Sequence, residues 1–451
     1  IAGSISSAGT FTHSSGTLTL NGTSAQSISG ASTTTFNNLT VTNVTAAITP
    51  TVNFNIAGTL NMNGSATIMT PSASVVVNNA GAAGIISGTG TIQVTRTAAT
   101  ADYSSQYKFT TNTLTSLTID YAGSGQVLSN LTYGPLKISG SITSASNTAS
   151  IDGTLNVTGT FTPSSGTITL NNGSSITNSG SLTFFNLTTA STSSVTSNSS
   201  FAVGGTFTID SSSVFTPSVA NVISGAGTLT GTGTAQVTRT SATADFSSQY
   251  TITGKTLTNL TIDYAGSGQV LSNLTYGHLK ISGSIATGTN NATLTGDFTN
   301  TGTFTPTAGT ITFSGADGST QLISGSSTFF NLSASTTSNS TGRTLRFTTG
   351  STQNVAGTWT ITGALGKVIT LESSAASPWT INPTSASVDY ASISYSTNSG
   401  TSFCATHSTN GGNNSGWNIN SGAVCNDAPS TPSLDAPLDT ATNQSITVVL
   451  L

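Results

Sequence analysis

Four charged positions are repeated in this chain, and the two copies of each are 143 residues apart. Acidic and basic groups in such sets could act as general acid and base on a glycosidic bond, as in β-helical enzymes that degrade polysaccharides. The same groups could instead form ion pairs or hydrogen bonds that hold a loop, whose copies read RTAATADYSSQY and RTSATADFSSQY. An enzyme rarely needs two equivalent sites, so the duplication favours a structural role. The pairs are Arg96 and Arg239, Asp102 and Asp245, Asp120 and Asp263, and Lys137 and Lys280.

Other catalytic or cofactor-binding groups do not assemble into a known pattern. No Ser/His/Asp set has a sensible spacing, no glycine-rich phosphate loop precedes a helix, and no aspartate-rich calcium repeat occurs. The sequence therefore predicts no enzyme activity, no cofactor and no metal. Tyrosines with the same 143-residue period are expected to fill the interior or its loops, with sugar stacking as the alternative role. These are Tyr107, Tyr121 and Tyr133, and Tyr250, Tyr264 and Tyr276.

The two cysteines, Cys404 and Cys425, flank a short GGNNSGW loop. A disulfide between them would close a loop of about twenty residues and would stabilise the fold by ~3 kcal/mol. The alternative, a metal held by both thiolates and His407, lacks a fourth ligand. We therefore predict a disulfide and an oxidising, extracellular setting.

Asn-x-Ser/Thr sequons are frequent, and they are either glycosylation sites or a chance result of a chain rich in Asn, Ser and Thr. The sequence alone does not distinguish these two interpretations. The candidate acceptors are Asn21, Asn38, Asn43, Asn130, Asn156, Asn186, Asn259, Asn273 and Asn331.

The charged pairs belong to a long internal repeat. The text DYAGSGQVLSNLTYG stands at residues 120–134 and again at 263–277. A third, partial copy appears when GTFTHSSGTLTL, GTFTPSSGTITL and GTFTPTAGTITF are aligned, and such repetition indicates an array architecture. The predicted divisions are three units followed by an extended linker with a terminal strand, at residues 1–150, 151–293, 294–426 and 427–451.

Composition predicts almost pure β-structure. Only nine basic and thirteen acidic residues occur in 451, so the charge pairs that support helices are nearly absent. Apolar residues stand singly between Thr, Ser, Gly and Asn with a period of two, which is typical of strands. A hydrophobic content of 35% with a net charge of −4 argues against disorder, and the few basic residues argue against nucleic-acid binding.

Two all-β folds fit this text: a parallel β-helix with rungs of ~20 residues, or a row of β-sandwich domains of ~100 residues each. Strand-like pieces follow one another at intervals of about one turn within each unit, and small side chains suit a narrow core. The β-helix is therefore preferred. At 20 to 25 residues per rung it would form roughly 17 to 21 rungs, stacked at about 4.8 Å into a rod of about 80 to 100 Å.

The phrases FNNLTV, LTNLTIDYAGSGQVLSNLTYG and GTFTPSSGTITLNNG resemble the β-strand repeats of very large bacterial and archaeal surface proteins, including filamentous adhesins. VDYASISYSTNSG and GGNNSGWNI are similar to the closing rung of such arrays. PSTPSLDAPLDTATNQSITVVLL resembles the opening strand of a fibronectin type III or Ig-like domain. The resemblance implies a right-handed β-helix at the cell surface.

Together these features predict an extracellular structural protein, the subunit of a surface filament with head-to-tail contacts between copies. The solenoid pattern already holds at Ile1, and SITVVLL at residues 445–451 either begins another domain or pairs with a partner's sheet. The alternative is an adhesin stalk that binds surface glycans, and no membrane insertion is expected. Thr-x-Thr triplets at residues 17–19, 167–169 and 310–312 make ice binding a weaker prediction, because they recur once per unit.

Overall fold

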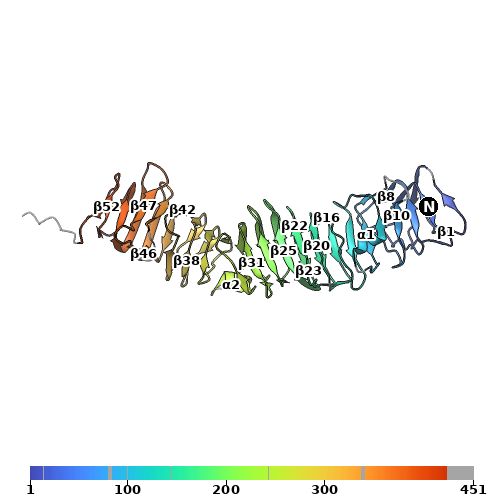
Figure 1. The fold of residues 1–451 in the computed structure, drawn as a ribbon, viewed down its shortest axis with the longest axis horizontal. Helices are drawn as coiled ribbons and strands as arrows, with labels where there is room; N and C mark the ends of the chain where they lie inside the picture. The colour runs from blue at the N-terminus through green and yellow to red at the C-terminus, as the bar shows by residue number, and fades with distance from the viewer. Residues whose placement is uncertain are drawn as a thin grey trace, which may run out of the picture.

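The structure is a computed structural model that describes residues 1–423 apart from 14, 80–83, 99, 144, 242 and 337–340. The described part of the chain is elongated, and its strands are stacked along the long axis (Figure 1). Every pairing between named strands in the described residues is parallel. This confirms the predicted all-β class and contradicts the alternative of β-sandwich domains, which are built from antiparallel sheets.

The longest ladder follows one side of the molecule. Its strands, in pairing order, are β9 (Ile68–Met69), β12 (Thr91–Val94), β15 (Thr118–Tyr121), β17 (Leu136–Ile138), β20 (Thr154–Val157), β23 (Ser175–Asn178), β26 (Ser194–Ser197), β29 (Val214–Pro217), β32 (Thr234–Val237), β34 (Thr261–Tyr264), β36 (His278–Ile281), β39 (Phe298–Asn300), β42 (Thr320–Ser324), β45 (Arg343–Phe347), β47 (Ile369–Ser373), β49 (Ala391–Ile393) and β52 (Thr409–Asn410).

Three further ladders each contain one of the Thr-x-Thr triplets. The first comprises β3 (Thr17–Leu20), β6 (Asn38–Val41), β8 (Thr59–Met62), β11 (Ile85–Gly88) and β14 (Thr111–Asn112). The second comprises β16 (Thr132–Tyr133), β19 (Ala149–Ile151), β22 (Thr167–Leu170), β25 (Asn186–Thr189), β28 (Thr206–Ile209), β31 (Thr228–Gly231) and β33 (Gly254–Lys255). The third comprises β35 (Thr275–Tyr276), β38 (Ala292–Leu294), β41 (Thr310–Phe313), β44 (Asn331–Ser335), β46 (Thr352–Thr362), β48 (Trp379–Asp389), β51 (Cys404–Thr406) and β53 (Asn418–Ile419), with β43 (Ser327–Phe329) on β46 and β50 (Ser396–Asn398) on β48.

The remaining strands form four further ladders, of two or five strands each. Two are β1 (Ile5–Ser7) with β4 (Ile28–Gly30), and β37 (Ser284–Ile285) with β40 (Thr303–Phe304). The other two are β2 (Phe11–Thr12), β5 (Thr34–Phe36), β7 (Phe54–Ile56), β10 (Val77–Asn79) and β13 (Tyr107–Lys108), and β18 (Ser141–Ile142), β21 (Thr160–Phe161), β24 (Ser181–Phe184), β27 (Phe201–Val203) and β30 (Ile223–Ser224).

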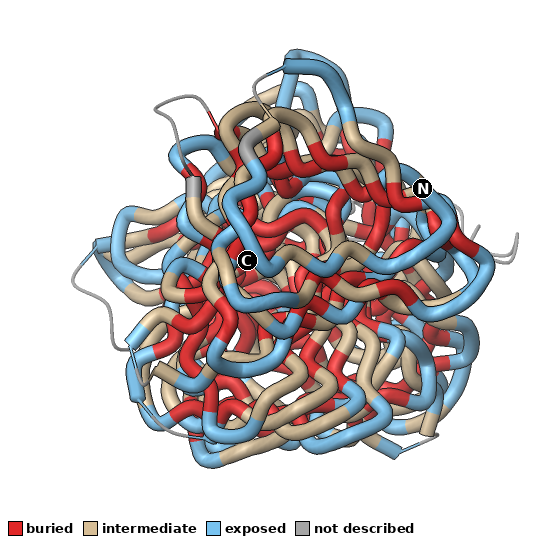
Figure 2. The backbone as a smooth tube through the Cα atoms, turned by 90° about the vertical axis from the view of Figure 1, so that its right-hand side faces the viewer, coloured by how far each residue is buried: buried red, intermediate tan, exposed pale blue. Residues whose placement is uncertain are grey.

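The register of these ladders gives the length of one turn. Leu155 pairs with Ile176, and Val195 pairs with Phe215, so the chain returns to the same face after about twenty residues. Alternate residues point inward on each strand, which produces the one-buried, one-outward pattern of the second Thr-x-Thr ladder. Seen along its length, the molecule has buried segments inside and exposed segments at the periphery (Figure 2). The architecture is β-solenoid-like, as predicted.

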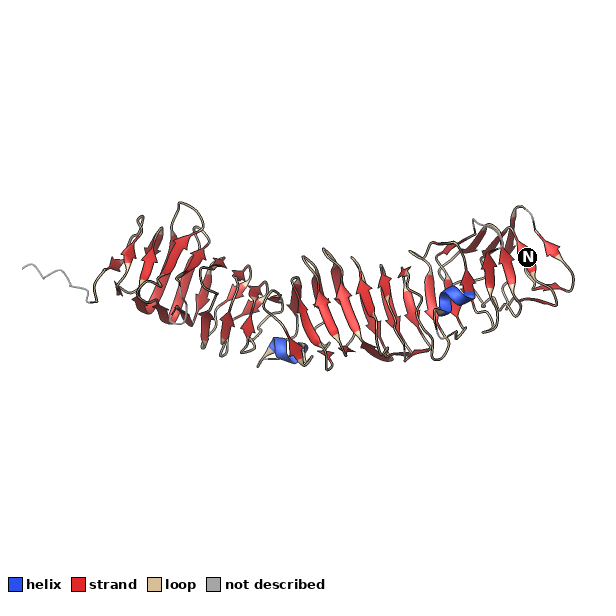
Figure 3. Cartoon of the chain, in the orientation of Figure 1, coloured by secondary structure: helices blue, strands red, loops and turns tan. Residues whose placement is uncertain are grey.

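Two short helices interrupt the stack at matching places. α1 (Asp102–Gln106) follows β12, and α2 (Asp245–Gln249) follows β32 (Figure 3). The rung that contains each helix is lengthened, since Gln93 pairs with Asp120 and Gln236 pairs with Asp263. Helices were not expected from the text, and each is only five residues long. No helix in the described part of the chain has the length and hydropathy needed to cross a membrane.

The last described rungs are wider than the others. Strands β46 and β48 are eleven residues long, and their pairing shifts register between Val355 and Thr358. Large rings fill the added width: Phe347 stacks on Trp379 with ring centroids 3.6 Å apart, and Trp359 is fully buried beside Trp379. This part differs from the narrow core that small side chains predicted for the whole chain.

Candidate functional site

The duplicated acids Asp120 and Asp263 lie at the centre of two matching hydrogen-bond chains on the longest ladder. Asp120 is buried, and its Oδ2 atom lies 3.3 Å from Lys137 Nζ and accepts a hydrogen bond from Gln93 Nε2 at 3.0 Å. The Ser139 hydroxyl donates to its Oδ1 atom at 2.7 Å. Thr70 completes the chain by donating to Gln93 Oε1 at 2.7 Å. Four neighbouring rungs are thereby joined through their side chains.

The second copy repeats these contacts. Lys280 Nζ lies 3.3 Å from Asp263 Oδ2, Gln236 Nε2 donates to the same oxygen at 3.2 Å, and the Ser282 hydroxyl donates to Oδ1 at 2.7 Å. Thr216 takes the place of Thr70. Both carboxylates are fully engaged and buried, an arrangement that holds rungs together and leaves neither acid facing a substrate.

Asp102 and Asp245 hold the helical insertions in place. The Asp102 carboxylate is buried and accepts hydrogen bonds from the backbone N–H groups of Ala98 and, at 2.5 Å, Val127. Asp245 does the same for Ser241 and, at 2.6 Å, Val270. A buried carboxylate is tolerated where charge-assisted hydrogen bonds replace water, and these bonds tie each helix to the turn that follows it.

Arg96 and Arg239 do not join these acids. Within the described residues neither guanidinium takes part in an ion pair, and Arg96 Nη1 only approaches the Ser74 carbonyl at 3.4 Å. Arg96 borders an open hollow of about 370 Å³ that contains no carboxylate. The hollow is lined by Ala73, Ser74, Arg96, Thr97 and Ala98. The four repeated charges therefore do not converge on one site.

The repeated tyrosines are fully buried beneath each insertion. The hydroxyls of Tyr121 and Tyr133 lie 2.8 Å apart, Ser129 N donates to Tyr121 at 2.9 Å, and Tyr133 donates to the Ser129 carbonyl at 2.8 Å. The Tyr107 hydroxyl donates to the Gln93 carbonyl at 2.8 Å. Burial raises the pKa of Tyr121 to about 12. These rings form a closed internal network, so no face is open for a sugar. Tyr250, Tyr264 and Tyr276 repeat it.

One difference between the copies involves two positions that change together. Tyr103 donates to Asn112 Oδ1 at 2.7 Å in the first copy. In the second copy Phe246 replaces the tyrosine, and Lys255 stands in place of the asparagine and donates to the Ile252 carbonyl at 2.5 Å. The phenol and its partner are lost together, which avoids an unpaired buried hydroxyl.

The sequons fall into two structural groups. Asn43 is buried and donates to the Ser24 carbonyl at 2.8 Å. Asn38, Asn186 and Asn331 occupy matching positions, and each Oδ1 accepts a backbone N–H from the next rung at 2.8 or 2.9 Å. These four carboxamides belong to the scaffold. Asn156 is half-buried on β20, and the exposed acceptors are Asn21, Asn130, Asn259 and Asn273.

The predicted disulfide remains a prediction, because Cys425 lies outside the described residues, as do residues 427–451. Cys404 begins β51 and is half-buried. Among the described residues no three His, Cys, Asp or Glu side chains come together as a metal site would require.

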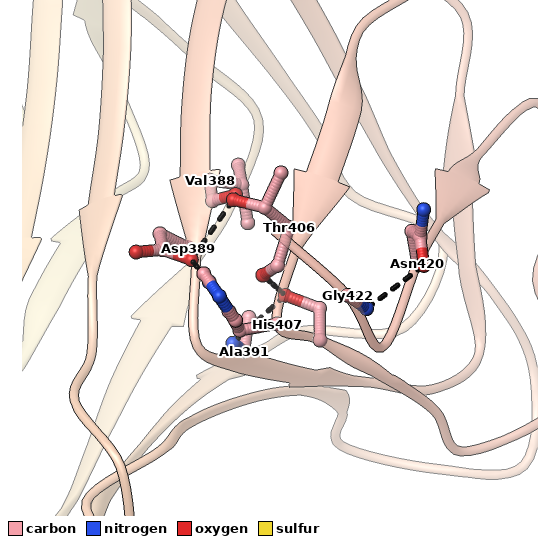
Figure 4. Close-up of polar contacts among 8 residues, drawn as sticks. Val388, Asp389, Ala391, Thr406, His407, Asn420 and Gly422 are labelled. Carbon is pink, nitrogen blue, oxygen red and sulfur yellow. Dashed lines mark hydrogen bonds and ion pairs between the residues drawn. The ribbon is translucent and has the colours of Figure 1, made fainter. Parts of the chain in front are cut away.

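His407 instead forms a cluster that the sequence did not predict (Figure 4). Its Nδ1 atom lies 2.7 Å from Asp389 Oδ1, and its ring stacks on Tyr390 with centroids 4.4 Å apart. The Thr406 hydroxyl donates to the same carboxylate oxygen at 2.8 Å. Burial alone would raise the pKa of Asp389, but the hydrogen bonds from His407 and Thr406 outweigh it and hold this pKa below 3.8. The cluster joins two adjacent rungs.

Comparison with known proteins did not identify a related protein. No family model matches the chain, and no match was found among curated proteins or solved structures. The resemblance to β-strand-repeat surface proteins therefore stays an expectation based on the quoted motifs.

Proposed function

We propose that this chain is an extracellular structural protein, a right-handed β-solenoid of three tandem units that serves as a subunit of a cell-surface filament. The observation that carries the proposal is the burial of the repeated acids. Each of them accepts hydrogen bonds from a neighbouring rung, as seen for Asp120, Asp263, Asp102 and Asp245. Groups that a catalytic site would present to a substrate are here part of the scaffold.

The parallel ladders support the same role. One ladder joins β9 to β52 without interruption, so each rung is joined to the next by backbone hydrogen bonds that run along the rod. The terminal rungs of any parallel ladder carry unpaired N–H and C=O groups. Head-to-tail assembly would continue the existing ladder into a second copy.

Electron microscopy of the purified chain at increasing concentration tests the filament. We expect unbranched fibres whose width equals that of one rod. Isolated rods of one subunit's length at every concentration would contradict self-assembly. They would favour the alternative in which the chain is a monomeric stalk.

An adhesin stalk that binds surface glycans is the second candidate. A shallow hollow of about 200 Å³ presents amide and hydroxyl groups of the kind that bind sugars. Its polar lining includes Asn300, Thr303, Thr305, Ser326, Thr328 and Asn354. A glycan array distinguishes the candidates: binding that weakens in Asn354→Ala supports the stalk, whereas an array without any signal contradicts it.

A further inference from the structure

One face of the solenoid carries a regular array of threonines that the sequence does not reveal. On the second Thr-x-Thr ladder, the register aligns one outward residue of each strand with the next: Thr169 with Thr188, Thr188 with Thr208, and Thr208 with Thr230. Ser150 and Thr132 continue this column through β19 and β16. Hydroxyls therefore recur once per rung. The sequence analysis considered only the Thr-x-Thr triplets, which recur once per unit, and so underestimated the number of aligned hydroxyls.

A second column runs beside the first. Thr167 pairs with Asn186, and Thr206 pairs with Thr228, two residues before the members of the first column. Outward side chains two residues apart on a strand are separated by about 6.6 Å, and neighbouring strands by about 4.8 Å. The face thus presents a two-dimensional mesh with these two repeats, built mainly of threonines, with Ser150 in the first column and Asn186 in the second.

The hydroxyls of the first column are available to a ligand. Among the described residues, the side chains of Thr169, Thr188, Thr208 and Thr230 make no hydrogen bond. The longest ladder differs, since its outward groups bond to one another, as Thr154 does with Ser175 at 2.9 Å and Thr216 with Gln236 at 2.7 Å. Threonine is β-branched and restricted at χ1, so its hydroxyl and methyl group have few available orientations.

The chemistry of this face makes several classes of partner unfavourable. Strands β16 to β31 of this ladder contain no Lys, Arg, Asp or Glu, so nothing on them would hold phosphate groups. Their aromatic side chains, Tyr133 and Phe207, are buried, so no ring is available to stack on a sugar or to anchor a protein. A ligand that matches a rigid mesh of hydroxyls and methyls at these spacings is ordered water.

We propose that the outward face of strands β16 to β31 binds ice. The repeats of the mesh are close to those between water oxygens on faces of hexagonal ice, and the methyl groups would order the water between the hydroxyls. The proposal does not depend on filament assembly, because the array lies within one chain.

The test compares ice growth in solutions of the wild-type chain and of two double variants. Thr188→Tyr with Thr208→Tyr places bulk in the centre of the face, and Thr177→Tyr with Thr196→Tyr places the same bulk on the longest ladder in adjacent rungs. We expect the wild type to facet ice crystals and to depress the freezing point below the melting point. The first variant should lose most of this gap, and the second should keep it.

Circular dichroism checks that both variants fold. If the tyrosine variant of the face does not fold, Thr188→Val with Thr208→Val removes only the hydroxyls, keeps the β-branched shape, and should narrow the gap. Wild-type protein that leaves ice growth unchanged would overturn the proposal. An equal loss in the Thr177 and Thr196 variant would overturn the assignment to this face.

Discussion

At the scale of single residues, the buried carboxylates are the groups whose removal should be felt most. Asp102 accepts two backbone N–H groups, and Asp102→Ala would leave both unpaired inside the protein. Each buried unsatisfied group costs about 1–3 kcal/mol. We expect hydrogen exchange of the Val127 amide to become at least tenfold faster in this variant.

The chain provides two controls for that experiment. Val270, the matching amide in the second copy, should keep its protection, because each rung contacts only its neighbours. Asp152 is exposed, so Asp152→Ala should change stability by no more than about 0.5 kcal/mol. Equal loss of protection at Val127 and Val270 would contradict a local role for Asp102.

Glycosylation, if it occurs, is restricted by the use of asparagine side chains in the scaffold. In a glycosylating host we expect glycans on the exposed Asn21, Asn130, Asn259 and Asn273. Asn43 should stay unmodified, because its amide is buried and bonded to Ser24. Mass spectrometry of glycopeptides checks this, and a fully occupied Asn43 would contradict the structure.

The Asp389–His407 contact should make the last rungs sensitive to acid. The pKa of Asp389 is lowered, so its contribution to stability is complete above 3.8 and is lost as the pH falls through the lower, folded-state pKa. More than a third of this carboxylate is exposed, so the effect should stay below about 1 kcal/mol. In an NMR titration, His407→Gln should raise the midpoint of Asp389 toward 3.8. An unchanged midpoint would show that the histidine does not hold this carboxylate.

At the scale of the rung, close backbone approach makes two adjacent glycines unequal. A Cβ atom on Gly205 would lie 2.4 Å from Asn186 Oδ1 and 2.9 Å from the Phe185 carbonyl, whereas one on Gly204 would meet nothing closer than 3.8 Å. Gly205→Ala should therefore lower the free energy of unfolding of this region by about 1–3 kcal/mol. Gly204→Ala serves as the matched control and should be close to neutral. Urea unfolding of both variants measures the difference, and equal effects would contradict it.

Much of the element level could be predicted from the sequence, because a period of two in the side chains directly reports strands with one buried face. The parallel pairing followed from the repetition of strand text at about one turn. The threonine column could not be predicted, because turn length varies. Gln93 pairs with Asp120 but Asp120 pairs with Lys137, so no constant offset in the text reveals which side chains align. The Asp389–His407 cluster was missed because its partners come from different rungs.

At the scale of the whole molecule, a rod is expected in solution. The ladder from β9 to β52 contains seventeen strands, which at about 4.8 Å per step gives about 77 Å along the axis. Small-angle scattering of the monomer should give a maximum dimension above this value and a skewed distance distribution. A symmetric distribution, as from a sphere, would contradict the extended arrangement.

The matching insertions have a consequence for how such a molecule changes its length. Seven pairing steps separate β12 from β32, the strands that precede α1 and α2, so one copy of the repeat advances the axis by about 34 Å. Each copy presents equivalent rungs to the next, as the paired contacts of Asp120 and Asp263 illustrate. Gain or loss of a copy by recombination would lengthen or shorten the molecule by that fixed increment without creating a new interface. The length of the rod can therefore change during evolution in steps of one repeat.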